Sequence, residues 1–376
     1  MTRRELMTLL AAAPLVRAAS TPTAPVSIAR CRSYDDDLTG TLSTMFDQLG
    51  GLGRIVNNKT VTIKVNLTGS PGLRFQGKQL GLTHYTHPRM AAATAYLMER
   101  SGARRVRFVE SCWATGGPME EYLLDSGWNV RTLFGAAKHV EFVNTNALGD
   151  AKKYARFKVP GGGYIFPAFD LHPAYEETDV FVSMAKLKNH ATCGVTLSMK
   201  NCFGITPASI YGDDSGEQEP NESPSKGRGE VCHAGKRGPS KSAPQEIDPR
   251  SSRHPGYRMP RIVADLAAMR PIHLAIIDGV ETITGGEGPW INGLRSVQPG
   301  VILAGTNATT TDTVATAVMG YDPRAQRGTA PFQDCDNSLR LAEARGVGTT
   351  DLKNIEVRGL SIKEALFLFP AANKRV

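Results

Sequence analysis

Short apolar runs alternate with amphipathic segments along most of the chain, a pattern typical of a sheet with helices on its faces. Residues 60–66 (TVTIKVN) predict a strand because β-branched side chains alternate with polar ones, and the apolar run 180–182 predicts a second, buried strand. Residues 89–101 predict a helix that ends at Gly102, and residues 106–110 predict the strand that follows it. This order of strand, helix and strand indicates a parallel sheet with a right-handed crossover.

The same alternation continues through the remaining regular segments. Further strands are predicted at residues 26–31 (an edge strand), 141–144, 273–277, 301–304 and 355–357, further helices at 38–49, 119–126, 262–269, 311–319 and 339–345, and a hairpin with a glycine turn at 157–166. The predicted fold class is therefore α/β, with a mostly parallel sheet, flanking helices and a long polar insertion.

The insertion is marked by an abrupt change of composition between residues 207 and 260. Glycine, proline, serine and charged residues dominate there, and aliphatic residues are scarce. Such a stretch cannot bury enough apolar surface to fold alone, so it is either disordered or a long lid held against a site. A lid would offer the side chains of Tyr211, His233, His254 and Tyr257. The chain is thus divided into residues 1–20, an N-terminal α/β part (21–206), the insertion (207–260) and a C-terminal α/β part (261–376).

The first 20 residues predict a targeting segment. Arg3 and Arg4 precede a short apolar run at residues 8–16, which is followed by the small residues Ala18 and Ala19. The adjacent arginines resemble a twin-arginine export signal, which would bring the protein to the export machinery and place it in the periplasm or otherwise outside the cytoplasm. The alternative is a frayed basic N-terminus.

Composition narrows the classes of partner and cofactor. The 376 residues carry a net charge of +8, but the lysines and arginines are spread out and form no nucleic-acid-binding motif, which favours a small anion as ligand. No run reaches the roughly 18 apolar residues of a membrane span, so an integral membrane protein is not predicted. The six cysteines contain no C-x-x-C pair, so we expect neither an iron–sulfur cluster nor a structural zinc site. They could form one or two disulfides, although Cys193 and Cys202 are expected to be free buried thiols.

Residues 178–206 carry the strongest candidate chemistry. Lys186, Lys188, Asn189 and His190 follow a predicted buried strand, and ligands of open α/β sheets lie beyond the carboxyl ends of strands. In this interpretation Lys186 and Lys188 hold an anion, and His190 transfers a proton because it titrates near neutrality. The alternative is that the lysines are solvated strand-end charges and that His190 is a hydrogen-bonded core residue.

Amide and lysine side chains on either side of this stretch extend the predicted site. Residues 194–201 could begin a helix whose free N–H groups attract the same anion. Lys200 and Asn201 could complete the anion pocket, or they could form an ordinary helix C-terminus capped by a nearby glycine. Asn66 lies at the end of the first predicted strand, on the same face as Lys64, and is a further expected polar contact.

Three acids supply the negative part of the predicted site. Asp278, Glu287 and Asp312 would contact the substrate, orient the bases or bind a divalent cation. Asp278 could instead occupy a turn after a strand, and Asp312 the first turn of its helix, where a carboxylate favours the helix dipole. The glycine-rich residues 285–290 contain Glu287 and Trp290 and predict a loop that closes on a ligand.

Two histidines offer a possible metal site. His84 and His87 are three residues apart and could bind a divalent or transition metal together with Glu110 or His190. His87 precedes Pro88, so it could equally be the residue that begins a helix. The sequence leaves the identity of any cofactor open.

The order of the short motifs is more specific than any one of them. Along the chain they are K-V-N-L, T-H-P, G-A-x-x-V with E-S, A-K-L-K-N-H, M-K-N-C-F-G, I-I-D-G, G-E-G-P, A-G-T-N with T-D, M-G-Y-D-P and G-V-G. In this order they resemble the domain-of-unknown-function family 362 across residues 61–357, which implies an α/β fold and a shared site but no established activity. Some members of that family carry ferredoxin-like cysteine clusters, which this chain lacks. The pattern is also similar to the nickel-pincer lactate racemases, which implies two α/β lobes around a cleft that holds a lysine and histidines.

Together these features predict an exported enzyme that binds a small carboxylate-like anion and transfers a proton next to it, as a racemase, epimerase or lyase does. Two alternatives stay open. One is a non-catalytic periplasmic binding or assembly protein whose insertion meets a protein partner, and the other is a redox accessory protein without its own iron–sulfur cluster. A serine hydrolase and a nucleotide-binding protein are not predicted, because their glycine-containing motifs are absent.

Overall fold

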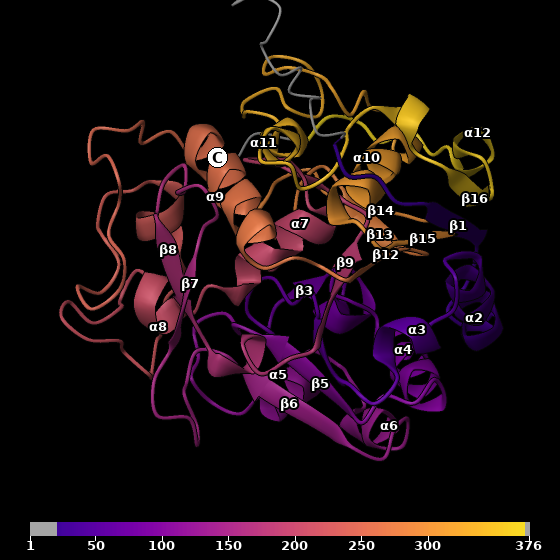
Figure 1. Ribbon diagram of the computed structural model, residues 1–376, viewed down its shortest axis with the longest axis horizontal. Helices are drawn as coiled ribbons and strands as arrows, with labels where there is room; N and C mark the ends of the chain where they lie inside the picture. The colour runs from indigo at the N-terminus through magenta and orange to yellow at the C-terminus, as the bar shows by residue number, and fades with distance from the viewer. Residues whose placement is uncertain (1–20, 373–376) are drawn as a thin grey trace, which may run out of the picture.

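The computed structural model describes residues 21–372, which form one eight-stranded sheet in the order β16-β1-β15-β12-β9-β2-β5-β6 (Figure 1). Its strands are β1 (Val26–Arg30), β2 (Thr60–Lys64), β5 (Arg105–Glu110), β6 (Val140–Asn144), β9 (Val180–Lys186), β12 (Leu274–Gly279), β15 (Val301–Gly305) and β16 (Val357–Gly359). All neighbours are parallel except the two pairs that β15 makes with β1 and β12. The predicted α/β fold with a mostly parallel sheet is confirmed, whereas two lobes are not, because this single sheet takes strands from both halves of the chain.

Helices cover both faces of the sheet. One face carries α2 (Leu38–Gln48), α3 (Gly53–Val56), α4 (Pro88–Arg100), α5 (Met119–Asp125) and α6 (Val130–Phe134), and the other carries α7 (Leu197–Asn201), α9 (Pro255–Met269), α10 (Ala308–Val318) and α11 (Ser338–Ala344). Side chains of a strand alternate between the two faces, so Leu274 and Ile276 of β12 join the first layer and Ala275 and Ile277 the second. The core therefore lies in two layers, one on each side of the sheet.

Short elements occupy the connections. Four two-stranded sheets pair β3 (Arg74–Phe75) with β4 (Lys78–Gln79), β7 (Ala155–Lys158) with β8 (Ala168–Leu171), β10 (Asn189–His190) with β11 (Gly194–Val195), and β13 (Thr282–Thr284) with β14 (Arg295–Val297). The other short elements include α8 (Ala208–Tyr211), a π-helix (Gly229–His233) and α12 (Ile362–Ala365).

Several predicted boundaries differ from the structure. β1 is not an edge strand, because it lies between β15 and β16, and the sheet ends at β16, which starts two residues later than predicted. The predicted helix at 262–269 begins earlier, at Pro255, because the His254 side chain caps it and proline suits the first helical position. The predicted hairpin pairs β7 with β8, so its second arm begins at Ala168.

A few apolar side chains anchor the polar insertion to the rest of the molecule. Ile210, Tyr211, Val231 and Cys232 are fully buried in the core that α9 and β8 also form. The Tyr211 hydroxyl accepts the backbone N–H of Asp170, in β8, at 2.9 Å. Figure 1 shows the insertion on the left, next to β7 and β8. The segment thus finds its apolar partners elsewhere in the fold, which its composition alone could not reveal.

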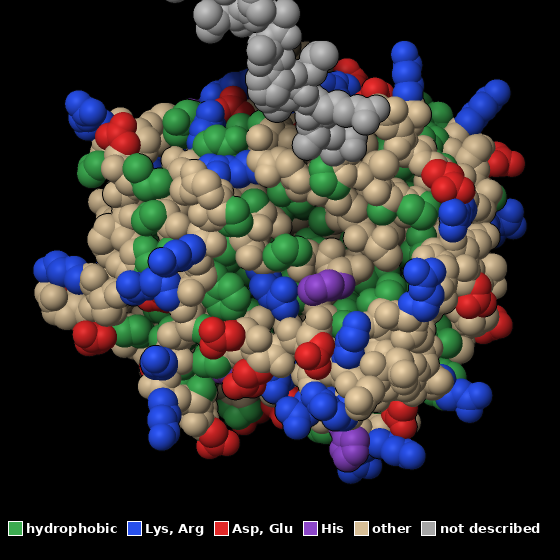
Figure 2. All heavy atoms as spheres, in the orientation of Figure 1, with side chains coloured by type: hydrophobic (Ala, Val, Ile, Leu, Met, Phe, Trp, Pro, Cys, Tyr) green, Lys and Arg blue, Asp and Glu red, His purple; other side chains and the backbone are tan. Residues whose placement is uncertain are grey.

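Three expectations from composition can be compared with the described residues. All six cysteines are buried and free, as expected for Cys193 and Cys202, and no disulfide joins any pair of them. Within residues 21–372, no helix combines the length and the apolarity that a membrane crossing requires. Figure 2 shows positive and negative side chains interspersed on the face that it presents, without one large basic patch. The predicted export signal at residues 1–20 lies outside the described residues.

Asp312 joins α10 to α7. Its carboxylate accepts the backbone N–H and hydroxyl of Ser198 (2.8 and 2.5 Å) and the backbone N–H of Met199 (2.8 Å). α10 begins at Ala308, so Asp312 lies beyond the first turn where the sequence placed it. The predicted helix at 194–201 is also shorter, since α7 follows the β10–β11 hairpin and has five residues. The acceptor at its N-terminus is therefore the protein's own Asp312 carboxyl group, whose burial raises its pKa to about 7 and which does not line the cavity described below.

Replacing Asp312 with alanine should lower the free energy of unfolding by about 3 kcal/mol, because the change leaves several buried donors without an acceptor. Urea denaturation followed by circular dichroism would measure the loss. Asp125→Ala, an exposed acid on α5, is the matched control and should change stability by less than about 0.5 kcal/mol. Equal stability of the two variants would contradict the assigned role of Asp312.

Candidate functional site

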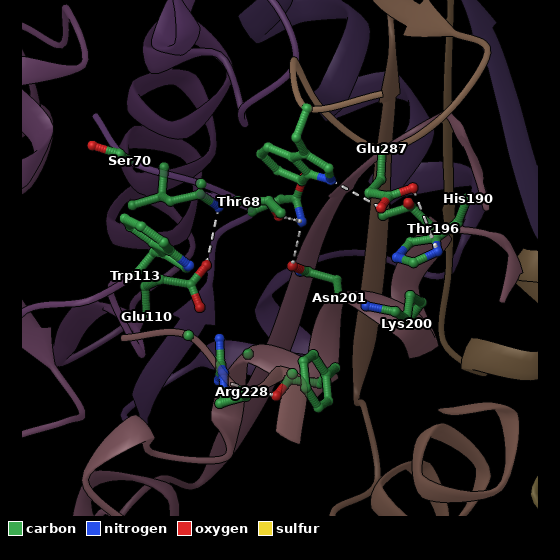
Figure 3. A pocket seen from close by; sticks show the side chains of 18 of the residues that line it. Thr68, Ser70, Glu110, Trp113, His190, Thr196, Lys200, Asn201, Arg228 and Glu287 are labelled. Atoms are coloured by element: carbon green, nitrogen blue, oxygen red, sulfur yellow. Dashed lines mark hydrogen bonds and ion pairs between the residues drawn. The ribbon is translucent and has the colours of Figure 1, made fainter. Parts of the chain in front are cut away.

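A cavity of about 460 Å³ lies at the carboxyl ends of β2 and β5 and beside the chain that follows β9. Its lining comes from the ends of those strands, the β10 strand, α7 and the turn after it, the insertion, and the loop at residues 285–290 (Figure 3). This is the position at which open α/β sheets bind ligands. Segments far apart in the sequence therefore meet where the sequence predicted a site.

The most deeply buried charges at the cavity are Lys64 and Glu110, which we call the floor pair. The Lys64 Nζ lies 2.9 Å from Glu110 Oε2 and donates to Asn201 Oδ1 at 3.0 Å. Glu110 also accepts the backbone N–H of Leu67 at 3.0 Å. Burial lowers the pKa of Lys64 and raises the pKa of Glu110, and each charge opposes the shift of the other. Because protein groups satisfy both charges, the floor pair supports the site and leaves ligand binding to other cations.

Asn201 joins the ends of β2 and β9 above this pair. Its Oδ1 accepts from Lys64 and from Asn66 Nδ2 (3.2 Å), and its Nδ2 donates to the Lys64 carbonyl (3.1 Å) and the Ser183 hydroxyl (3.0 Å). The Oδ1 of Asn66 is buried and accepts no hydrogen bond from any residue between 21 and 372. Because buried acceptors are normally paired, this oxygen is available to a donor of a ligand.

His190 and Glu287 face each other on one side of the cavity (Figure 3). His190 Nδ1 is 3.7 Å from Glu287 Oε2 and accepts the backbone N–H of Thr192 at 3.1 Å. Burial lowers the pKa of His190 well below its usual range, so the ring is neutral and carries its proton on Nε2. Burial alone would raise the pKa of Glu287. The attraction of the His190 ring in its protonated form and the N–H groups of Ala191 (3.0 Å) and Trp290 (3.1 Å) outweigh that effect and lower the pKa to about 2.

Two cations lie against the ring of Phe203. Lys200 Nζ is 4.6 Å from the ring centroid and Arg228 Cζ is 4.8 Å from it. Arg228 donates to the Thr206 carbonyl and the Ser111 hydroxyl, but neither cation forms an ion pair with a residue in the described part of the chain. Burial lowers the pKa of both groups, that of Lys200 to about 8. These are the positive charges that an anionic ligand could neutralise.

Lys186 and Asp278 do not line the cavity. Lys186 Nζ lies 2.8 Å from Asp278 Oδ2 and 2.5 Å from the Tyr34 hydroxyl, and β9 and β12 place the two charged residues directly opposite each other. The sequence predicted that Lys186 would contact an anion and that Asp278 would orient the bases. In the structure the two residues instead form an internal ion pair with each other. The alternative prediction for Asp278 was a turn after a strand. The Asp278 carboxylate accepts the backbone N–H of Val280 at 3.1 Å, which fits this alternative.

Lys188 and Asn189 support the cavity from behind its lining. Lys188 Nζ donates to the carbonyls of His84 and Glu287, both at 3.2 Å, and burial lowers its pKa to about 7. Asn189 Oδ1 accepts the backbone N–H of Gly285 at 3.1 Å. Both side chains hold the 285–290 loop in position. The sequence had predicted that they would contact a substrate instead.

His84, His87 and Glu110 are not brought together. His84 Nε2 lies 3.1 Å from the Thr68 carbonyl, His87 accepts the backbone N–H of Arg89 as the N-cap of α4, and Glu110 belongs to the floor pair. Between residues 21 and 372, no three His, Cys, Asp or Glu side chains gather into a group that could hold a metal ion. The helix-entry role that the sequence also offered for His87 is the observed one.

Sequence reasoning missed Phe203 and Arg228. Phe203 lies inside the M-K-N-C-F-G motif, whose lysine and asparagine drew attention instead. Arg228 belongs to the insertion, and no pattern there singles it out from the other basic residues. Of the residues that were predicted, Asn66, His190, Lys200, Asn201 and Glu287 line the same cavity.

The sheet and the helices on its faces define an α/β protein with a cavity at the carboxyl ends of its strands. The chain belongs to the family described as Domain of unknown function (DUF362), whose model matches residues 61–317. It is 28% identical over 193 residues to the Thylakoid-associated protein sll1697 of Synechocystis sp., a match that covers 49% of this chain and 51% of that protein, so the chain spans about half the length of this curated relative. A crystal structure of a protein from Thermotoga maritima is similar with a TM-score of 0.36 and 12% identity, over 72% of this chain and 56% of that chain.

Gly204 allows the floor pair to form, and Gly204→Ala should disrupt it. An added Cβ would lie 2.3 Å from Glu110 Oε1 and 2.5 Å from Lys64 Nζ, distances that force the ion pair to move. We expect a loss of about 2 kcal/mol or more in the free energy of unfolding, measured by urea denaturation. The control is Gly53→Ala, where the nearest atom to an added Cβ is 3.6 Å away, and which should be tolerated. An equally stable Gly204→Ala protein would contradict the described contact.

Proposed function

We propose that this protein is an enzyme that binds a small carboxylate in the strand-end cavity and transfers a proton next to it, as a racemase, epimerase or lyase does. The observation that most supports the proposal is the pair of cations against Phe203. Lys200 and Arg228 are partly buried and form no ion pair with a carboxylate among the described residues, although cations that are removed from water are normally paired. A ligand carboxylate would supply the missing negative charge.

The contacts of Arg228 leave part of its guanidinium for a ligand. All of its hydrogen bonds to described residues use Nη1, so Nη2 and Nε are available for a carboxylate. Two parallel N–H donors match the two oxygens of a carboxylate, which makes arginine well suited to this role. Lys200 would contact the same group as a point charge, and Asn66 Oδ1 would accept from a hydroxyl of the substrate.

Proton transfer is assigned to His190 and Lys200. The pKa of Lys200, about 8, lies near the value that suits an acid or base at neutral pH. A carboxylate bound beside these groups would raise the pKa of both, because a nearby negative charge favours their protonated forms. Glu287 would stabilise the protonated form of His190 once the ring takes up a proton, and Lys188 would hold the loop that carries Glu287.

The insertion serves as a lid in this proposal, because its residues Asp213, Arg228 and His233 belong to the cavity lining. We also propose that the protein acts outside the cytoplasm, on the strength of its twin-arginine-like residues. The alternative function is a non-catalytic binding or assembly protein, for which the same cavity would hold a ligand without reacting with it.

Binding of a carboxylate should depend on Lys200 and weaken at high pH. With 2-hydroxybutyrate as the probe, Lys200→Met should lose about tenfold to a hundredfold in affinity at pH 7, because a charged hydrogen bond contributes about 1.5–3 kcal/mol. The wild-type affinity should fall as pH rises above the pKa of Lys200 in the free protein, about 8, because the free amine then loses its charge, and it should level off above the higher pKa of the bound state. Calorimetric titration measures both effects.

Two variants test whether Lys200 itself causes this behaviour. Lys200→Arg should keep its affinity to higher pH, because a guanidinium stays protonated. Lys153→Met, an exposed lysine away from the cavity, should bind like the wild type. Unchanged affinity in Lys200→Met would overturn the assignment of Lys200 to the anion site.

His190 should be needed for proton transfer but not for binding. In deuterated buffer the wild-type protein should introduce deuterium at C2 of at least one acid among lactate, 2-hydroxybutyrate and mandelate, as seen by NMR. His190→Gln should slow that exchange at least a hundredfold while affinity changes less than about threefold. His139→Gln, an exposed histidine, is the control. Tight binding of these acids without exchange in the wild type would instead favour the non-catalytic alternative.

A further inference from the structure

The cavity has apolar side chains at its outer end as well as cations inside. Leu73 and Trp113 both line it, and their side chains are 41% and 43% exposed. Isolated exposed apolar residues are ordinary, but two large ones at the rim of one cavity are a feature that marks ligand-binding sites. Trp290 adds a third apolar surface to the lining. We call Leu73 and Trp113 the apolar rim.

Close backbone packing fixes the aromatic members of this surface. A Cβ added at Gly227, in the insertion, would lie 2.9 Å from Trp113 Nε1, and one added at Gly69 would lie 2.4 Å from the ring of Trp290. Glycine lets the main chain approach the indoles this closely. The main chain of two loops from different parts of the chain therefore packs directly against the two indoles.

The size of the cavity also exceeds what a very small acid needs. Its volume of about 460 Å³ falls within the range of roughly 300–1,000 Å³ that is typical of sites for drug-sized ligands. A three-carbon acid has six heavy atoms and would leave most of this space, and the whole apolar rim, in contact with water. A ligand with an apolar group would cover the rim and remove that contact.

We propose that the cavity selects an amphipathic monocarboxylate, whose carboxylate meets Lys200 and Arg228 and whose aromatic or branched aliphatic group lies against Leu73 and Trp113. This inference deepens the function proposed above and rests on it. It adds that specificity lies in the apolar half of the ligand, at residues that take no part in proton transfer.

A series of acids tests the inference on the full-length wild-type protein. Affinities for acetate, butyrate, hexanoate and 3-phenylpropionate would be measured by calorimetry at constant pH and ionic strength. We expect affinity to rise roughly threefold to fourfold per buried methylene, the change that corresponds to about 0.8 kcal/mol, and 3-phenylpropionate to bind at least a hundredfold more tightly than acetate. Quenching of tryptophan fluorescence would give a second reading, since two of the three tryptophans line the cavity.

Variants of the apolar rim distinguish the binding contribution of the ligand's apolar group from that of its carboxylate. Leu73→Ser and Trp113→Ala should each weaken binding of 3-phenylpropionate at least fivefold and leave acetate within twofold, and Trp113→Phe should recover most of the loss. Lys200→Met should weaken every acid by a similar factor. Leu124→Ser, which replaces an exposed leucine of α5 outside the cavity, is the matched control for Leu73→Ser and should behave like the wild type.

The possible failures are distinguishable. Acids that bind through Lys200 with no dependence on the apolar group would overturn the inference and leave the proposed carboxylate site standing. Rim variants that weaken acetate and 3-phenylpropionate equally would also overturn it, because they would show a general effect on the fold. If no acid in the series binds to the wild type, both the proposed function and the inference are wrong.

Discussion

The buried ion pair between Lys64 and Glu110 is the contact on which the cavity depends. It joins the ends of two neighbouring parallel strands, and the backbone N–H of Leu67 and the amide of Asn201 complete its hydrogen bonds. Breaking such a pair by removing one partner costs about 3–5 kcal/mol, because the other charge stays buried without compensation. Gly204 has no side chain where the turn after α7 passes over the pair, so one residue choice in that turn allows the whole arrangement.

The positive charges near the sheet edge differ in how they are neutralised. Lys64 and Lys186 each meet a carboxylate of a neighbouring strand, at 2.9 and 2.8 Å, and Lys188 is held by two carbonyl groups. Lys200 and Arg228 have an aromatic ring as their shared neighbour. An aromatic face attracts a cation only weakly compared with a carboxylate, so it leaves most of the positive charge unneutralised. The geometry thus separates cations that hold the fold from cations that face the cavity.

Much of this arrangement could be predicted from sequence because strand periodicity and strand-end chemistry are local. The alternation at residues 60–66 predicted β2. Of the residues that line the cavity, Asn66 and His190 follow predicted strands, Lys200 and Asn201 precede a glycine, and Glu287 lies in a glycine-rich loop. The prediction failed where pairing between distant strands decides the outcome. Lys186 looked like a site residue, but β12 sets Asp278 directly opposite it, and no local pattern reveals that neighbour.

The prediction of a ligand anion at the N-terminus of α7 failed for the same reason, because its partner comes from a distant part of the chain. The sequence indicated that its N–H groups would attract a ligand anion, but they donate to the carboxyl group of Asp312, which lies more than 100 residues away in the chain. For the insertion, composition left disorder and a lid held against the site as alternatives, and buried apolar residues such as Ile210, Tyr211, Val231 and Cys232 tie it to the core. In each case local chemistry was identified, and its partner was not.

The cavity takes side chains from both halves of the chain and from the insertion. The N-terminal part supplies the floor pair, the amides of Asn66 and Asn201, and Lys200. The insertion supplies Arg228 and packs Gly227 against Trp113, and the C-terminal part supplies Glu287 and Trp290. A cation delivered by the insertion would bring that segment into contact with a bound anion directly. In the proposed function, ligand binding and the ordering of the insertion would be coupled through Arg228, because an anion that neutralises this side chain would also stabilise the segment that carries it.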